Sequence, residues 1–178
     1  MKKTHGSLFS GIGAPELASE WIGWENLFHC EINDFCRSFL EKRFKSTSYA
    51  DITTTDFNIW RGRVDILTGG FPCQDASKAK QTGGRGQLGL EGHRTGLWWH
   101  MYRAIDEICP RWVVAENVAN ITRVNNGRDF AKILHSLSGL GYNAEWKIMY
   151  ASDAGAPQRR AKCYLVAYSN GIRLPAGK

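Results

Sequence analysis

Residues 8–16 read Leu-Phe-Ser-Gly-Ile-Gly-Ala-Pro-Glu, and this stretch decides how the rest of the chain is interpreted. An apolar segment at 7–9 is predicted to be a strand that leads into a glycine-rich turn. Pro15 then favours a helix, because its fixed φ suits the first helical position. A strand, such a turn and a helix together let a ligand approach the backbone closely. A structural turn would have a similar sequence, so this stretch alone leaves both interpretations open.

The chain beyond this turn alternates short apolar runs with segments of helical periodicity. This alternation predicts βαβ units and hence an α/β fold with a mainly parallel sheet. Strands are expected at 26–31, 64–68, 112–115, 144–151 and 162–168. Helices are expected from Pro15, after the N-cap candidate Asn33, between Leu97 and Pro110, and from about Asp129 to Ser138. The last two strands can pair as an antiparallel hairpin at the sheet edge.

Aromatic and aliphatic residues of the predicted helices are expected to supply the core. The helix after Asn33 carries an apolar set made of Phe35, Cys36, Phe39 and Leu40. Most tryptophans are core candidates, although two of them, Trp98 and Trp99, are also candidates to line a groove. The tryptophans considered are Trp21, Trp24, Trp98, Trp99, Trp112 and Trp146.

Length and composition indicate a single globular unit. At 178 residues, 43% of them hydrophobic, the chain can bury one substantial core and is too short for two ordinary domains. We expect one domain at 1–168 and a C-terminal tail at 169–178, where the apolar pattern dissolves.

Charge and cysteine content narrow the class of protein. The 23 Lys and Arg against 17 Asp and Glu give a net charge of +6, which weakly favours a polyanionic partner. No apolar run approaches the ~20 residues of a membrane helix, and the N-terminus lacks the apolar core of a signal peptide. We therefore expect a cytoplasmic protein with no membrane partner. Five cysteines without a C-x-x-C pair predict neither a disulfide framework nor a zinc site, and no metal is expected.

The sharpest feature is Gly-Gly-Phe-Pro-Cys-Gln-Asp-Ala-Ser at 69–77, in which Cys73 follows a proline at the carboxyl end of a predicted strand. Ligands of open α/β sheets bind at that edge. A free thiol has an ordinary pKa of about 8.5, so a nucleophilic cysteine needs activation at neutral pH. A buried structural cysteine is the alternative, and it is the better interpretation for the others: Cys30, Cys36, Cys109 and Cys163.

Three acids follow predicted strands and are candidates for the same edge. Glu116 abuts the strand at 112–115, where partial desolvation favours the protonated form of a carboxyl group and suits it to donate a proton. A helix-capping or ion-paired acid is the alternative there. Glu31 ends the second strand, where a carboxylate can hold the ribose hydroxyls of a nucleoside. Asp51 follows a possible short third strand and is a candidate to accept from an adenine amino group, with a solvated loop acid or helix cap as the alternative.

The ordered motifs LFSGIG, GGFPCQ, RTGLWW, ENV and PQRR resemble those of the DNA (cytosine-5) methyltransferases. The resemblance extends from about Ser7 to Tyr168, with the motifs in the family's order. It implies the Rossmann-like fold of S-adenosylmethionine-dependent methyltransferases and double-stranded DNA as the partner. The implied reaction transfers a methyl group to C5 of a cytosine that has been flipped out of the duplex.

The resemblance also implies a site for S-adenosylmethionine. In it, Glu31 matches the ribose-binding acid and Asp51 the adenine contact. The positions that match the family's cofactor-binding segments are Phe9, Ser10, Gly11, Ile12, Gly13, Glu31, Ile32, Asp51, Ile52, Gly70 and Pro72.

The catalytic residues that the resemblance implies begin with Cys73, which matches the nucleophile that adds to cytosine C6 and makes C5 electron-rich. Glu116 matches the acid that engages N3 and the exocyclic amine, and Asn117 a residue that shapes the pocket. Arg160 matches the first arginine of the family's next motif. Lys162 stands where a second arginine usually contacts the base, and it keeps the charge but loses the planar, forked set of donors.

The segment 77–92 resembles the family's mobile loop that closes over the flipped base. The DNA contacts implied for this region are Gln74, Ser77, Lys78, Lys80, Arg85 and Arg94. Family members then continue into a target-recognition region, for which 169–178 has no room. Three hypotheses stay open: a core that needs a second subunit or a lost C-terminal half, a truncated core that binds cofactor without methylating, and a non-catalytic DNA-associated module. The motifs suggest a bacterial or phage restriction-modification setting.

Overall fold

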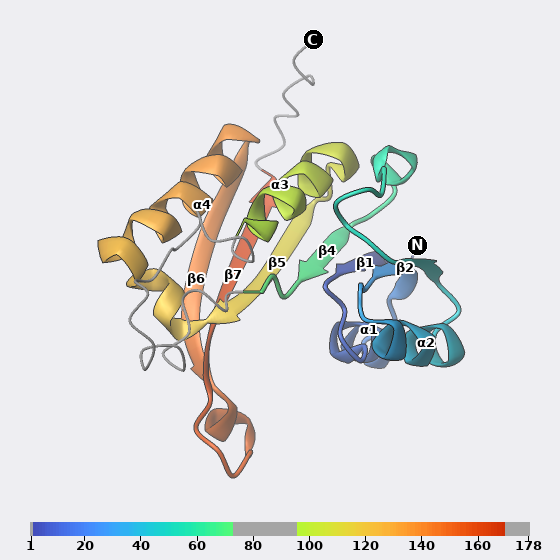
Figure 1. The fold of residues 1–178 in the computed structure, drawn as a ribbon, viewed down its shortest axis with the longest axis horizontal. Coiled ribbons are helices and arrows are strands. Elements are labelled where there is room, and N and C mark those ends of the chain that lie inside the picture. Colours follow the sequence, from blue (N-terminus) through green and yellow to red (C-terminus); the bar gives the residue numbers. More distant parts are fainter. Residues whose placement is uncertain (1, 73–95, 170–178) are drawn as a thin grey trace.

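A single mixed sheet organises the part of the chain that the computed structural model describes, residues 2–72 and 96–169. Within those ranges the sheet has seven strands in the order β3-β2-β1-β4-β5-β7-β6 (Figure 1). The strands are β1 (Thr4–Leu8), β2 (Glu25–Cys30), β3 (Thr47–Tyr49), β4 (Ile66–Gly69), β5 (Trp112–Val118), β6 (Tyr142–Tyr150) and β7 (Ala161–Ser169).

The direction of the strands confirms the predicted fold class. β3, β2, β1, β4 and β5 pair in parallel, whereas β7 is antiparallel to both β5 and β6. The predicted hairpin is therefore present, and its second strand lies between the first and the parallel part of the sheet. β5 is longer than the predicted 112–115, because β7 pairs along it as far as the Val118–Lys162 register.

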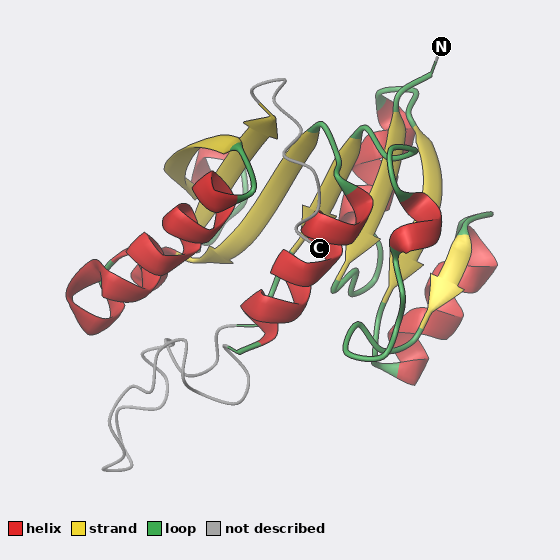
Figure 2. Ribbon diagram, turned by 90° about the horizontal axis from the view of Figure 1, so that it is seen from above, coloured by secondary structure: helices red, strands yellow, loops and turns green. Residues whose placement is uncertain are grey.

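Helices cover both faces of the sheet. Figures 1 and 2 show α1 and α2 on one face and α3 and α4 on the other. The bounds are α1 (Ala14–Trp21), α2 (Asp34–Arg43), α3 (Leu97–Ile108) and α4 (Arg128–Gly139), with short 3₁₀ helices at Asn58–Trp60, Ala119–Thr122, Val124–Gly127 and Ala151–Ala154. None of the helices in the described ranges is long and apolar enough to cross a membrane.

Local signals in the sequence set where the helices begin and end. Asn33 is the N-cap of α2 as predicted, and its side-chain oxygen accepts from the Cys36 amide at 3.0 Å. α3 ends at Ile108, before Pro110, which cannot continue a helix. Trp98 of α3 is completely buried, and its indole N–H donates to Ser136 Oγ of α4 at 3.2 Å. This bond joins the two helices on their face of the sheet.

Several aromatic residues expected in the core lie at the surface. Phe35 is 78% exposed, Phe39 47% and Trp21 77%. Leu40 is the buried residue of α2. Because α2 lies at the margin of the sheet, over the short β3, only a narrow side of the helix is buried. Trp99, Trp112 and Trp146 are also exposed, so the expectation that most tryptophans are buried is wrong.

Glu16 is an ionisable residue that is fully buried. It lies in the first turn of α1 and has no exposed surface. Neither carboxylate oxygen has a hydrogen-bond partner of good geometry among the described residues, although the Ser7 and Ser10 hydroxyls lie close enough to stabilise the charge slightly. Burial raises the pKa of Glu16, and the negative charge of Glu31 adds to this effect.

The raised pKa of Glu16 predicts a specific dependence of stability on pH. The folded state holds the proton more tightly than the unfolded state, so stability falls as pH rises from the ordinary value of 4.5 through the folded pKa. Glu16→Gln removes the ionisable group and is expected to stabilise the protein by about 1–2 kcal/mol at pH 8. The gain should shrink as the pH falls below that window. Urea unfolding at pH 8 and pH 4 measures both effects.

The exposed Glu25, at the start of β2, gives the matched control Glu25→Gln. That variant should follow the wild-type pH dependence. A Glu16→Gln protein less stable than wild type at pH 8 would contradict the prediction.

Candidate functional site

The turn after β1 has the backbone shape that its glycines predict. Phe9, Gly11 and Gly13 have positive φ values of 53°, 56° and 88°. Ser10 holds the turn in place, since its amide donates to the Cys30 carbonyl at 3.2 Å and its hydroxyl bonds to Ser7 Oγ at 2.7 Å. A Cβ at Gly13 would lie 2.5 Å from the Phe44 ring, so only glycine fits both the conformation and the space.

Glu31 ties this turn to the start of α2. One carboxylate oxygen accepts from the Gly11 amide at 2.7 Å, and the other accepts from the Asn33 amide at 2.8 Å. Each oxygen still has a free lone pair, because a carboxylate accepts up to about four hydrogen bonds. Ile12 and Ile32, which follow Gly11 and Glu31 in the chain, are 64% and 70% exposed. The predicted ribose acid thus lies at the glycine turn with capacity to accept hydroxyl groups.

Asp51 lies beyond β3, in a turn that it stabilises itself. Its side chain accepts from the Thr53 amide at 2.8 Å. This bond lowers the pKa of Asp51 and keeps the carboxylate charged. The neighbouring Ile52 is only 5% exposed and packs into the core. Asp51 therefore offers an acceptor at this edge, whereas the side chain of Ile52, predicted to contact the cofactor, is part of the core.

The ends of β4 and β5 bring three of the predicted residues together. A Cβ at Gly70 would lie 3.1 Å from Glu116 Oε2, so the absence of a side chain at Gly70 gives this carboxyl group its space. Asn117 is buried, and its side-chain amide donates to the Phe71 backbone carbonyl at 3.1 Å. This bond fixes the backbone immediately before Pro72. Cys73 itself lies outside the described residues, as do Gln74, Ser77, Lys78, Lys80, Arg85 and Arg94.

Lys162 pairs with Glu116 across β5 and β7. Lys162 lies opposite Val118 and Glu116 opposite Tyr164 in the antiparallel register, so the two side chains are on the same face of the sheet. Lys162 Nζ forms an ion pair with Glu116 Oε1, which has no hydrogen bond of good geometry from the described residues. Glu116 is thus the ion-paired acid that the sequence left open as the alternative, and the cation beside it can orient it.

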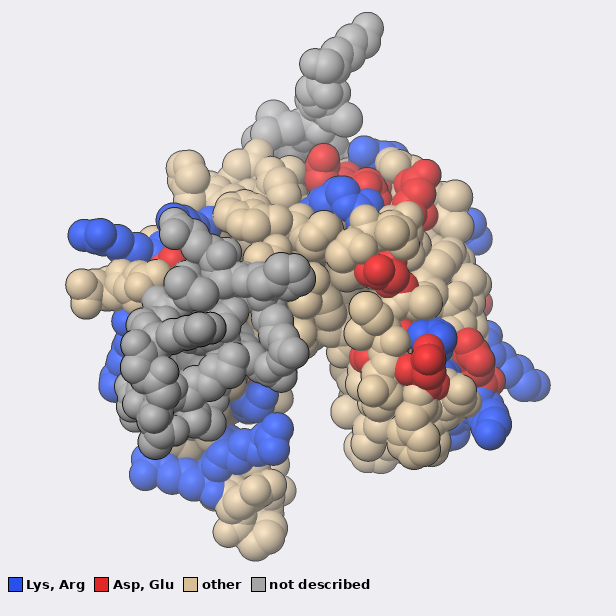
Figure 3. All heavy atoms as spheres, viewed as in Figure 1, with Lys and Arg blue, Asp and Glu red and all other residues tan. Residues whose placement is uncertain are grey.

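Arg160 precedes β7 and forms no part of the ion pair between Lys162 and Glu116. It is the last residue of the loop that joins β6 and β7, with an exposed side chain and a φ of 24°. The neighbouring Arg159 stacks over the Tyr150 ring with 4.7 Å between guanidinium carbon and ring centroid. Figure 3 shows Lys and Arg side chains gathered over this hairpin, on one side of a hollow whose other side carries α1 and α2.

Glu16 was not predicted to have any role from its sequence position. Its place in the first turn of a helix, after Pro15, is typical of an exposed acid that interacts with the helix dipole. The structure instead places it beneath the glycine turn, close to Ser7 and Ser10. Among the described residues no cluster of His, Cys, Asp or Glu could hold a metal ion.

Comparison with known proteins identifies the family. The sequence model described as C-5 cytosine-specific DNA methylase matches residues 4–176. The chain belongs to this DNA methylase family. The family predicted from the ordered motifs is therefore confirmed. S-adenosylmethionine is the methyl donor of the C-5 DNA methylases.

Curated relatives and solved structures agree with the assignment to the C-5 DNA methylases. The chain is 33% identical to the type II methyltransferase M.Sau3AI of Staphylococcus aureus, covering 93% of this chain and 43% of the relative. It is 35% identical to M.NgoBI of Neisseria gonorrhoeae, covering 93% of this chain and 50% of the relative. The chain thus spans about half the length of these curated relatives.

Solved structures of two methyltransferases share the fold. The Dnmt2 methyltransferase of Schizosaccharomyces pombe aligns with 100% of this chain and 52% of its own, at a TM-score of 0.71 and 18% identity. The Entamoeba histolytica methyltransferase EhMeth aligns with 100% of this chain and 57% of its own, at a TM-score of 0.72 and 19% identity. The Rossmann-like methyltransferase fold is confirmed by these similarities.

The four cysteines among the described residues of this DNA methylase have free thiols, so the burial of each can be tested by alkylation. Burial raises the pKa of Cys30 to about 12 and also raises that of Cys163. Alkylation requires the thiolate, so we expect iodoacetamide at pH 8 to leave both residues unmodified in the folded protein. Peptide mass mapping after a fixed exposure measures this. The urea-unfolded chain is the control, and equal modification of Cys30 in both states would contradict the prediction.

Proposed function

We propose that this chain is the catalytic core of a DNA cytosine-5 methyltransferase, with Cys73 as the nucleophile. The observation that carries the proposal is the arrangement at the ends of β4 and β5. There Gly70 makes room for the Glu116 carboxyl group, and Asn117 holds the backbone that leads into Cys73. An acid held against the backbone that leads into a cysteine is the constellation that covalent addition to a cytosine ring requires.

The described residues fit S-adenosylmethionine as cofactor. The glycine turn offers close approach to its backbone, and Glu31 sits on that turn with free lone pairs for ribose hydroxyls. Asp51 supplies a charged acceptor for the adenine amino group. When bound, the cofactor supplies an electrophilic methyl group on a positively charged sulfur. Phe9, Ser10, Gly11 and Gly13 are proposed to cradle it.

The proposed chemistry proceeds through an adduct on Cys73. The Cys73 thiolate forms a bond to C6 of a cytosine flipped out of double-stranded DNA, while Glu116 engages N3 and the exocyclic amine and draws electron density toward them. C5 then takes the methyl group. A solvent-derived base removes the C5 proton, and the electron pair of that C–H bond forms the C5–C6 double bond as the C6–sulfur bond breaks, which releases 5-methylcytosine and the Cys73 thiolate. Lys162 orients Glu116 during these steps.

The DNA is proposed to lie against the basic hairpin and the Lys- and Arg-bearing segment that follows Cys73. Arg159 and Arg160 are exposed on the hairpin, where cationic side chains can contact phosphates (Figure 3). Gln74, Ser77, Lys78, Lys80, Arg85 and Arg94 are proposed contacts by family resemblance. The bacterial type II relatives suggest a restriction-modification setting.

We further propose that sequence recognition comes from residues outside this chain, in a second polypeptide or another segment. The relatives are about twice as long as the matched chain. The face of β5, β7 and β6 opposite α3 and α4 exposes large apolar side chains, with Trp112 at 43%, Tyr164 at 37% and Met149 at 47%. An exposed apolar surface of this kind favours a partner. A core that binds cofactor without methylating is the second candidate.

A covalent trap tests the proposal. The purified chain is mixed with S-adenosylmethionine and duplex oligonucleotides that carry 5-fluorocytosine in varied contexts, because fluorine at C5 blocks release of the enzyme. We expect an adduct visible by denaturing gel and mass spectrometry, and its loss in Cys73→Ser. Cofactor binding by calorimetry without an adduct would overturn activity of the chain on its own, and would leave a core that needs a second subunit or a truncated core that does not methylate. Failure to bind cofactor as well would favour a non-catalytic DNA-associated module.

The Lys162 position gives a second prediction. Lysine presents a point charge to Glu116, whereas arginine adds a planar fork that can bond the acid and the base together. Lys162→Arg is expected to form the 5-fluorocytosine adduct at least as fast as wild type. Lys162→Met should slow it by roughly tenfold or more, because Glu116 loses its orienting cation. Single-turnover rates at saturating cofactor measure both, and a Lys162→Met variant as fast as wild type would remove Lys162 from the mechanism.

A further inference from the structure

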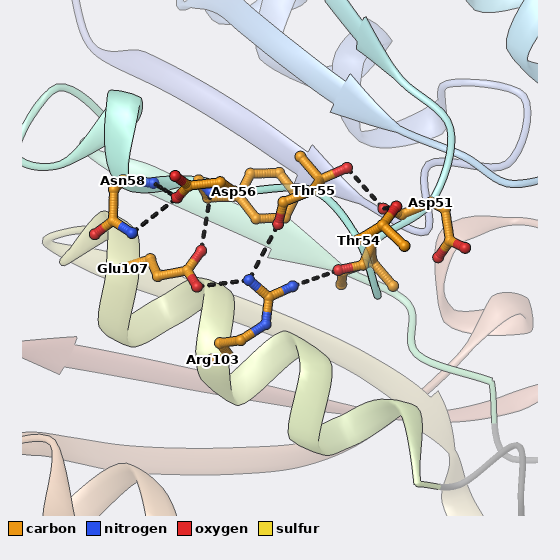
Figure 4. A network of polar contacts seen from close by, with 9 residues as sticks. Asp51, Thr54, Thr55, Asp56, Asn58, Arg103 and Glu107 are labelled. Carbon is orange, nitrogen blue, oxygen red and sulfur yellow. Dashed lines mark hydrogen bonds and ion pairs between the residues drawn. The ribbon is translucent and has the colours of Figure 1, made fainter.

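A polar network joins helix α3 to the segment that carries Asp51. Figure 4 shows the Arg103 guanidinium directed at the backbone of residues 51–57. Its Nη2 donates to the Ile52 carbonyl at 2.5 Å, and its Nη1 donates to the Thr55 carbonyl at 3.0 Å. One side chain therefore holds two carbonyls on either side of the turn that follows Asp51.

Glu107, one helical turn along α3, completes this network. One of its oxygens pairs with Arg103 Nη1 at 2.5 Å, and the other accepts from the Phe57 amide at 2.9 Å. The Glu107 side chain is only 16% exposed, so the pair is screened less by solvent than a surface ion pair. Arg103 and Glu107 together thus bond to the backbone of Ile52, Thr55 and Phe57, which are at the beginning, middle and end of this segment.

The bonds that Asp51 makes by itself do not fix its position in the site. Its side chain accepts from the Thr53 amide, and its carbonyl accepts from Thr55 Oγ1 at 2.6 Å. Both partners belong to the same turn, so these bonds shape the turn without anchoring it to the sheet. The anchoring comes from the buried Ile52 and Phe57 side chains and from the Arg103 fork.

We propose that Arg103 is a positioning residue that makes the cofactor site selective for adenine. The inference rests on the proposed role of Asp51 as acceptor for the adenine amino group. A carboxylate attracts that amino group and repels the carbonyl oxygen that hypoxanthine carries at the same place. This discrimination needs the Asp51 carboxylate at a fixed distance from the base, and the Arg103 bonds to Ile52 and Thr55 supply that constraint.

The test compares two ligands that differ only in the base. Calorimetry on the full chain measures the Kd of S-adenosylhomocysteine and of S-inosylhomocysteine. Wild type is expected to prefer the adenine ligand by about tenfold, since one discriminating polar contact separates the two. Arg103→Met should reduce the preference to roughly twofold. Arg103→Lys should reduce it as well, because an ammonium group cannot hold both carbonyls and Glu107 in one plane.

Two controls distinguish a positioning role of Arg103 from a general contribution to the stability of the fold. Arg111→Met removes an arginine that is 67% exposed and 3.9 Å from Asp65, and it should leave the preference unchanged. Thermal melting checks that each Arg103 variant is folded, and Arg103→Lys is the variant measured if Arg103→Met does not fold. An unchanged preference in the Arg103 variants would overturn the inference, and so would an equal loss of affinity for both ligands.

The wild-type result separates this inference from the function on which it rests. Wild type that binds both ligands equally would overturn the adenine role of Asp51 and the inference, and would leave methyl transfer by Cys73 in place. Wild type that binds neither ligand would overturn the proposed cofactor site and the inference with it.

Discussion

The parallel register of β1, β4 and β5 is the constraint on which the rest of the structure depends. Leu8 pairs with Gly69, and Gly69 pairs with Ala115, so three strands far apart in sequence reach the same level of the sheet. The glycine turn, the backbone that leads to Cys73, and Glu116 therefore start from one edge. Parallel strands end together at such an edge and leave their loops free to hold ligands. The proposed chemistry needs a nucleophile, an acid and a cofactor in one place, and that alignment is compatible with it.

Much of the fold was predictable because its signals are local. The strand-turn-helix at 8–16, the Asn33 cap and the end of α3 before Pro110 each depend on a few adjacent residues, and the structure contains all three. The positions of Phe35 and Trp21 were not predictable in this way. How much of a helix is buried depends on the breadth of the sheet beneath it, and α2 covers only the margin at β3.

The candidate site was predictable in its composition but not in its contacts. Glu31 at the glycine turn follows from a strand end, which the sequence marks. The Lys162–Glu116 ion pair depends on β7 lying between β5 and β6, an order that no local pattern specifies. The Asn117 bond to the Phe71 carbonyl likewise spans two strands. Long-range register decides such contacts, and a single sequence carries little information about it.

Three glutamates show how the fold assigns different chemistry to one residue type. Glu31 receives two backbone amides and keeps free lone pairs, which suits a carboxylate that binds hydroxyl groups. Glu116 has a cation beside it and a glycine in front of it, so its carboxyl group lies between Lys162 and the backbone of Gly70. Glu16 has neither, and burial favours its neutral form. The raised pKa means that Glu16 holds a proton over a wider pH range than an exposed glutamate would, and a bound proton there removes a negative charge close to Glu31.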